Sequence, residues 1–158
     1  MSNMRFRTII FLEEDGTGLS PYAEVLLAHK LQMQGIWGFE IYSRGNVVLF
    51  PEPANQKIQE LARRKGTTLS GYRAKPLTGE EFADDTLILA FDAASKQNIY
   101  DRFPNAVNVY MLREFVGEAG DIRLPIGGSM EEYEAVCAVV DRVTDRLIDK
   151  LMEREEPI

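Results

Sequence analysis

The stretch FLEEDGTGLSPYAE, residues 11–24, decides how the chain is interpreted. It passes from an apolar strand through a short glycine-containing loop into the start of a helix. Backbone N–H groups of such a loop, together with those of the first helical turn, form a positive concavity that suits an anion. The loop nevertheless contains three acids, Glu13, Glu14 and Asp15, and no base. The stretch therefore predicts a backbone built for an anion, with side chains that would repel one.

The composition is that of an ordinary globular protein. With 158 residues, 45% of them hydrophobic and 27% charged, the chain fits a single domain over residues 1–158. The net charge is −7, and the one basic run, ARRKG at residues 62–66, is typical of a solvated helix end. We therefore expect no nucleic-acid partner and no anionic membrane surface as a partner.

Two further absences in the sequence limit the possibilities. No run approaches the roughly 20 apolar residues of a membrane span, and the apolar part of the N-terminus is too short for a signal peptide. Cys137 is the only cysteine, so no disulfide partner and no zinc-ligand set are available within the chain. We expect a cytoplasmic protein without a cofactor, in which Cys137 is an inert core thiol.

Apolar runs alternate along the chain with helical patterns, which predicts a parallel sheet covered by helices. Strands are expected at residues 7–12, 39–45, 86–91 and 107–112. Helices are expected at residues 20–35, 54–66, 95–103 and 130–153, with a turn or short helix at 78–85 and a long loop at 113–129. Ser20 suits the N-cap of the first helix. In such a fold ligands collect beyond the carboxyl ends of the strands, so the site is expected among loop 13–19, the segment after Phe91 and loop 121–128.

Several short motifs follow one another in a familiar order. They are SPYAEVLLAHKL, FEIYSRG, LSGYRAKPLTGEEFADDTLILAFD, LREF and LPIGGSMEEYE. Together they resemble the low-molecular-weight protein tyrosine phosphatases over nearly the whole chain. The resemblance implies that family's α/β fold, a three-layer α/β/α sandwich with a central four-stranded parallel sheet.

The resemblance also implies where the chemistry of the family would lie. These enzymes use a cysteine nucleophile, an arginine in the pattern Cys, five residues, Arg, Ser, and an aspartic acid before the Pro of an Asp-Pro-Tyr-Gly-Gly segment. In this sequence the three positions hold Glu13, Leu19 and Leu124. The phosphate-binding loop of the family would correspond to Glu13, Glu14, Asp15, Gly16, Thr17, Gly18, Leu19 and Ser20.

These replacements predict a degenerate site with no intact catalytic residue. A carboxylate is a far weaker nucleophile than a thiolate, and leucine can neither clamp phosphate nor donate a proton. We therefore expect a pseudophosphatase that binds a protein or a small ligand. One alternative is an enzyme of different chemistry that uses Glu13, with Arg73, Lys75 or Arg123 as its cationic partner. The other is retained tyrosine phosphatase activity.

Three interpretations of Glu13 remain open at this stage. It could be a solvated loop acid, or its carboxylate could fold back onto the N–H groups of the loop and replace the phosphate. It could also act in catalysis or bind Mg²⁺ or Ca²⁺ together with Glu14 and Asp15, although consecutive acids rarely point at one centre. Ser20 would then be placed to hydrogen-bond the residue at position 13.

Other residues near the expected site have simpler interpretations. Asp92 is expected to organise the loop at a strand end, and Asp121 is a weak candidate for a displaced general acid. Four apolar residues could edge the pocket, although burial in the core is expected for the first three: Trp37, Phe39, Phe91 and Ile126.

Overall fold

The structure is a computed structural model that describes residues 5–153. Its centre is one parallel sheet of four strands in the order β2-β1-β3-β4. The strands are β1 (Thr8–Glu13), β2 (Glu40–Gly45), β3 (Thr86–Ala90) and β4 (Val109–Met111). The predicted four-stranded parallel sheet is therefore confirmed.

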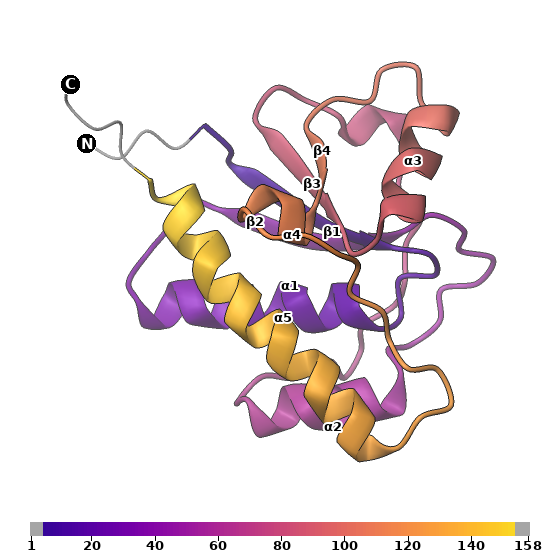
Figure 1. Cartoon of the computed structure of the whole chain (residues 1–158), viewed down its shortest axis with the longest axis vertical. Helices are drawn as coiled ribbons and strands as arrows, with labels where there is room; N and C mark the ends of the chain where they lie inside the picture. The colour runs from indigo at the N-terminus through magenta and orange to yellow at the C-terminus, as the bar shows by residue number, and fades with distance from the viewer. Residues whose placement is uncertain (1–4, 154–158) are drawn as a thin grey trace.

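Helices cover both faces of the sheet (Figure 1). One face is covered by α1 (Leu19–Met33) and α5 (Met130–Leu151), with α2 (Gln56–Arg64) packed against both. The other face is covered by α3 (Ala93–Arg102), and the short elements η1 (Gly79–Glu81) and α4 (Leu112–Phe115) lie in the connections. None of the helices described is long and apolar enough to cross a membrane.

Alternating side chains of β1 serve two separate cores. Ile9 and Phe11 belong to the larger core beneath α1 and α5, whereas Ile10 and Leu12 belong to a smaller one that includes Ile99 of α3. Successive residues of a strand point to opposite faces of its sheet. Both faces are thus buried, which explains the uninterrupted apolar run and confirms the three-layer sandwich.

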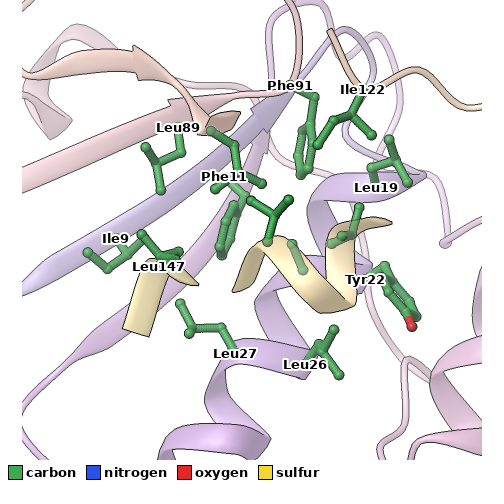
Figure 2. Close-up of a cluster of buried hydrophobic side chains, with 14 of the residues drawn as sticks. Ile9, Phe11, Leu19, Tyr22, Leu26, Leu27, Leu89, Phe91, Ile122 and Leu147 are labelled. Carbon is green, nitrogen blue, oxygen red and sulfur yellow. The ribbon is translucent and has the colours of Figure 1, made fainter. Parts of the chain in front are cut away.

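The larger core extends to the carboxyl end of the sheet. In Figure 2, Leu19, Phe91 and Ile122 lie at one end of this cluster, beyond Phe11. The rings of Phe11 and Phe91 are stacked with their centroids 6.1 Å apart. The loop after β1 therefore packs against the apolar side chains of the larger core.

Two predicted boundaries were wrong. Helix α1 begins at Leu19, with Gly18 at the N-cap position, so Ser20 lies inside the first turn and does not cap the helix. The loop predicted from residue 113 is interrupted at once by α4, a single turn too short to show helical periodicity in the sequence. The remaining bounds of the predicted strands and helices agree to within a few residues.

Trp37 is not in the core. It is 72% exposed and follows the end of α1, between two glycines with positive φ, Gly35 and Gly38, that turn the chain toward β2. Phe39 is partly buried and Phe91 is fully buried, as expected. Cys137 is buried in α5, and burial raises the pKa of its thiol to about 12, which agrees with an inert core cysteine.

Candidate functional site

The Glu13 side chain turns back into the loop that follows it. Its carboxylate accepts hydrogen bonds from the backbone N–H groups of Gly18 (3.1 Å), Leu19 (3.2 Å) and Ser20 (2.6 Å). The Ser20 hydroxyl donates a fourth. These N–H groups lie at the start of α1, where they have no partner within the helix. The prediction that Glu13 fills the anion site is confirmed, and its interpretation as a solvated loop acid is wrong.

Burial and hydrogen bonding act in opposite directions on the Glu13 carboxyl. Removal from water raises its pKa above the usual value, and the hydrogen bonds from Ser20 and Gly18 oppose that rise without cancelling it. The neighbouring Asp15 adds a smaller repulsion that also raises the pKa.

Two glycines allow the loop to close around this carboxylate. Gly16 has a φ of +73°, and a Cβ there would lie 3.1 Å from the backbone nitrogen of Gly45. A Cβ on Gly18 would lie 2.9 Å from Oε1 of Glu13 and 2.7 Å from Cδ2 of Leu124. A side chain at position 18 would therefore displace the Glu13 carboxylate or Leu124, whereas the positive φ and the backbone neighbours of Gly16 favour glycine there.

Tyr72 holds the loop against the neighbouring strand. Its hydroxyl donates a hydrogen bond to the Gly16 carbonyl (2.6 Å) and shares another with the Ser43 hydroxyl of β2 (2.7 Å). Burial raises the pKa of Tyr72 to about 12, so the hydroxyl keeps its proton at neutral pH. These contacts fix the position of the loop relative to the sheet.

The segment of residues 46–55 runs beside the loop and is fastened to it at both ends. Near its start, the Val47 N–H donates to the Glu14 carbonyl (2.8 Å). At its end, the Asn55 N–H donates to the Thr17 carbonyl (2.8 Å), while the Asn55 side chain caps α2. The loop is thus held both by Tyr72 and by this segment.

The three acids of the loop do not converge on one point. Glu13 faces the N–H groups, whereas Asp15 accepts hydrogen bonds from the N–H (3.0 Å) and hydroxyl (2.9 Å) of Thr17. Glu14 is exposed. Within residues 5–153, no group of three or more His, Cys, Asp or Glu side chains is arranged to hold a metal ion. This geometry does not support the alternative of a Mg²⁺ or Ca²⁺ site.

A cavity of about 460 Å³ lies next to Glu13, beyond the carboxyl ends of β1 and β3. The three loops that were expected to meet here do line it. The lining residues are Glu13, Glu14, Asp15, Thr17, Leu19, Asn55, Phe91, Asp92, Ile122, Arg123, Leu124 and Ile126. The cavity therefore combines apolar walls with several carboxylates.

Leu19 and Leu124 contribute packing to this cavity and no charge. Leu19 is buried in the larger core, and Figure 2 shows it at the same end of the cluster as Ile122. Leu124 is partly buried and packs against Gly18, beside the Glu13 carboxylate. The positions at which the resemblance expects arginine and aspartic acid are thus filled by aliphatic side chains.

Arg123 is the only base among the described residues that line the cavity, and it is already paired. Its Nη2 lies 2.9 Å from Oδ2 of Asp121, which also accepts a hydrogen bond from the Ala93 N–H (3.0 Å). The hydrogen bond from the Ala93 N–H, and to a smaller extent that from Arg123, lowers the pKa of Asp121. A general acid must hold a proton to donate, so the Asp121 carboxyl does not suit this role. Asp92 caps α3 by accepting a hydrogen bond from the Ser95 N–H (2.7 Å), which confirms its structural role.

Arg73 and Lys75 do not line the cavity, and both are exposed. Their motif was noted in the sequence for its charges, but its tyrosine, Tyr72, is the residue that contacts the loop. Ser43 and the segment 46–55 were also missed. A serine in a strand and an irregular connection carry no pattern that would indicate such contacts.

The fold and the loop can be compared with known proteins. Residues 8–156 match the family model described as low molecular weight phosphotyrosine protein phosphatase. The chain belongs to this family. Its relatives include a protein-arginine-phosphatase of Geobacillus stearothermophilus, which is 32% identical over 149 residues, covering 93% of this chain and 97% of the relative.

Two further comparisons agree with this family membership. A probable low molecular weight protein-tyrosine-phosphatase of Ralstonia nicotianae, EpsP, is 30% identical and covers 84% of this chain and 87% of its own length. The crystal structure of a low molecular weight protein tyrosine phosphatase from T. tengcongensis superposes with a TM-score of 0.85 at 28% identity, covering 90% of this chain and 98% of that one.

Proposed function

We propose that this member of the family is a pseudophosphatase, which binds a protein or a small ligand at the cavity and does not hydrolyse phosphate esters. The resemblance places Glu13, Leu19 and Leu124 at the positions of the nucleophile, the phosphate-binding arginine and the general acid. Loss of the nucleophile from a covalent mechanism costs on the order of 10⁶ in rate on its own. The other two losses remove the phosphate clamp and the proton donor.

The observation that carries this proposal is the position of the Glu13 carboxylate. It already uses the N–H groups of Gly18, Leu19 and Ser20, the backbone donors to which a phosphate would have to bind. A phosphate ester could enter only if this side chain left, which would remove four hydrogen bonds. Each hydrogen bond to a charged group contributes about 1.5–3 kcal/mol.

Electrostatic repulsion supports the same conclusion. Two like unit charges about 4 Å apart repel by about 4 kcal/mol at an effective dielectric constant near 20, and a phosphate dianion carries twice that charge. Glu14 and Asp15 also line the cavity, and the single base, Arg123, is paired with Asp121. No cation of the site is free to offset the repulsion within the part of the chain described.

The two alternatives have less support. An enzyme that uses Glu13 as a base or nucleophile needs a carboxylate free to reach its substrate, whereas this one is held by four donors. Retained phosphatase activity would agree with the names of the relatives, which are tyrosine and arginine phosphatases. That activity would have to proceed without the three groups that the resemblance assigns to it.

A hydrolysis assay tests the proposal directly. The purified protein is incubated with an aryl phosphate and with a phosphoarginine peptide, and release of inorganic phosphate is followed. We expect no turnover above that of heat-inactivated protein. Turnover that is abolished by Glu13→Ala would overturn the proposal and favour an enzyme that uses Glu13.

A further inference from the structure

Two hydroxyl groups connect the acidic loop to the neighbouring strand. The Tyr72 hydroxyl oxygen lies 2.6 Å from the Gly16 carbonyl oxygen and 2.7 Å from the Ser43 hydroxyl oxygen. Ser43 is only 3% exposed, so its partners are groups of the protein. Because each hydroxyl has a single proton, the direction of each hydrogen bond in this chain is fixed.

The proton of Tyr72 is donated to the loop. A carbonyl oxygen can only accept, so Tyr72 is the donor to Gly16. Burial raises the pKa of Tyr72 to about 12, and the proton is therefore present at neutral pH. With the Tyr72 proton used in this way, the contact between the two hydroxyls requires the proton of Ser43. Ser43 has no proton left to donate to a third group.

Glu24 of α1 is such a third group. Burial raises the pKa of Glu24, and hydrogen bonds with the hydroxyl and the N–H of Ser43 oppose that rise without cancelling it. The N–H of Ser43 can donate to one carboxyl oxygen. The Ser43 hydroxyl cannot donate to the other, because its proton is used in the contact with Tyr72. A hydrogen bond between Glu24 and this hydroxyl therefore needs a proton on Glu24.

We infer that Glu24 is a carboxylic acid at neutral pH, and that its proton completes a hydrogen-bonded chain from Glu24 through Ser43 and Tyr72 to the Gly16 carbonyl. Glu24 is thus a positioning residue for the loop that contains Glu13. Loss of its proton leaves two protons for three contacts, so one hydrogen bond of the chain is lost. The loop is then held less firmly at alkaline pH than at neutral pH.

The cations near Glu24 do not oppose this assignment. Arg44 and Lys75 both lower the pKa of Glu24, but less than the hydrogen bonds from Ser43 do. Arg44 is paired with Glu81 (2.8 Å) and also donates to the Ser43 carbonyl (2.8 Å). Lys75 is exposed, where solvent weakens the effect of its charge. Within residues 5–153, neither cation forms an ion pair with Glu24.

The side-chain carboxyl carbon of Glu24 reports its protonation state in carbon NMR of the natural protein. At neutral pH we expect its chemical shift to be that of a carboxylic acid, and to change to that of a carboxylate only as the pH is raised. The backbone N–H resonance of Thr17, whose peptide group contains the Gly16 carbonyl, should shift over the same pH range. A carboxylate shift for Glu24 at neutral pH, or a Thr17 resonance that does not follow Glu24, would overturn the inference.

Removal of the Tyr72 hydroxyl tests the direction of the chain. In Tyr72→Phe the Ser43 proton is freed and can be donated to Glu24, which stabilises the carboxylate. We therefore expect Glu24 to lose its proton at a lower pH in this variant than in the natural protein. The control is Tyr100→Phe in α3, which also removes a hydroxyl that donates to a backbone carbonyl (Val109, 3.3 Å) and should leave Glu24 unchanged. An unchanged titration of Glu24 in Tyr72→Phe would contradict the chain.

Glu24→Gln imitates the protonated acid at every pH, because its amide can donate to the Ser43 hydroxyl and accept from the Ser43 N–H. A carboxyl whose pKa is raised on folding stabilises the protein below its pKa in the unfolded state. This contribution is lost as the pH rises through its pKa in the folded state. Between neutral and alkaline pH, the melting temperature of the natural protein should therefore fall more than that of Glu24→Gln. Glu40→Gln, at an exposed residue of β2, should follow the natural protein. Parallel declines of the natural protein and Glu24→Gln would show that Glu24 is not protonated.

Discussion

At the scale of single residues, the site depends on one carboxylate and the glycine beside it. Glu13 satisfies the N–H groups of Gly18, Leu19 and Ser20, which would otherwise need an anion or water. Gly18 allows this because any Cβ would meet both Glu13 and Leu124. The loop is therefore ordered by its own side chain and needs no bound phosphate.

Truncation of Glu13 should reduce the stability of the fold. Glu13→Ala leaves the N–H donors at the start of α1 without their acceptor, and unsatisfied donors of this kind cost about 1–3 kcal/mol. We expect a loss of that size in the free energy of unfolding, measured by urea denaturation. The control is Glu14→Ala, an exposed neighbour whose removal should change stability by less than about 0.5 kcal/mol. Equal effects of the two variants would contradict the role given to Glu13.

At the scale of elements, the segment after α4 is fixed to α5 by a group of charges. Glu118 forms ion pairs with Arg142 (2.7 Å) and Arg146 (2.7 Å) of α5 and with Arg113 (3.3 Å) of α4. This segment leads to Ile122 and Leu124 at the cavity. The charges thus help to position one wall of the site from a distance.

These ion pairs predict a pH dependence of stability. Arg142 and then Arg146 lower the pKa of Glu118 from 4.5 to about 2. A carboxyl whose pKa is lowered on folding stabilises the protein at any pH above its pKa in the unfolded state. This contribution is lost as the pH falls through its pKa in the folded state. Stability measured by thermal melting should therefore decline between pH 4.5 and about 2 less steeply in Glu118→Gln than in the natural protein. Parallel declines would show that Glu118 contributes nothing.

Most elements could be predicted because their sequence signals are strong. The run Leu87–Phe91 is uniformly apolar because both faces of β3 are buried, and Ser-Pro marks the start of α1. The prediction of an N-cap at Ser20 was wrong because this residue lies inside the first turn and its hydroxyl donates to Glu13. Trp37 was placed in the core because hydrophobicity alone cannot tell which apolar residues their neighbours will cover.

The candidate site was only partly predictable from the sequence. The contact of Glu13 with the N–H groups of α1 could be proposed from the sequence as one of three interpretations, since both ends of that contact are local, but the sequence did not decide among them. The contact of Tyr72 with Gly16, by contrast, joins residues 56 positions apart. The exposure of Leu49 and Phe50 likewise depends on the path of an irregular segment.

At the scale of the whole molecule, the chain has the fold of its family around a loop that its own Glu13 carboxylate fills. The sheet, the helices and the cavity beyond the strand ends are those of a low molecular weight phosphotyrosine protein phosphatase. The side chains that line this cavity are mostly acidic or apolar.

Restoring the three family residues should restore some chemistry if the backbone has kept its shape. In the variant Glu13→Cys, Leu19→Arg, Leu124→Asp, the freed N–H groups and the new side chains should bind phosphate and hydrolyse an aryl phosphate slowly. The variant should also melt at a lower temperature, because Leu19 is buried in the core. A folded triple variant without any turnover would show that the loop itself has changed, and Glu13→Cys alone serves as the control.

The central claim is that Glu13 fills the anion site of its own loop, and an NMR titration with inorganic phosphate tests it most directly. The backbone N–H resonances of Gly18, Leu19 and Ser20 report on the donors themselves. In the natural protein we expect these resonances to move no more with phosphate than with chloride at equal ionic strength. In Glu13→Ala they should shift with phosphate and saturate. Saturable shifts of these three resonances in the natural protein would contradict the account.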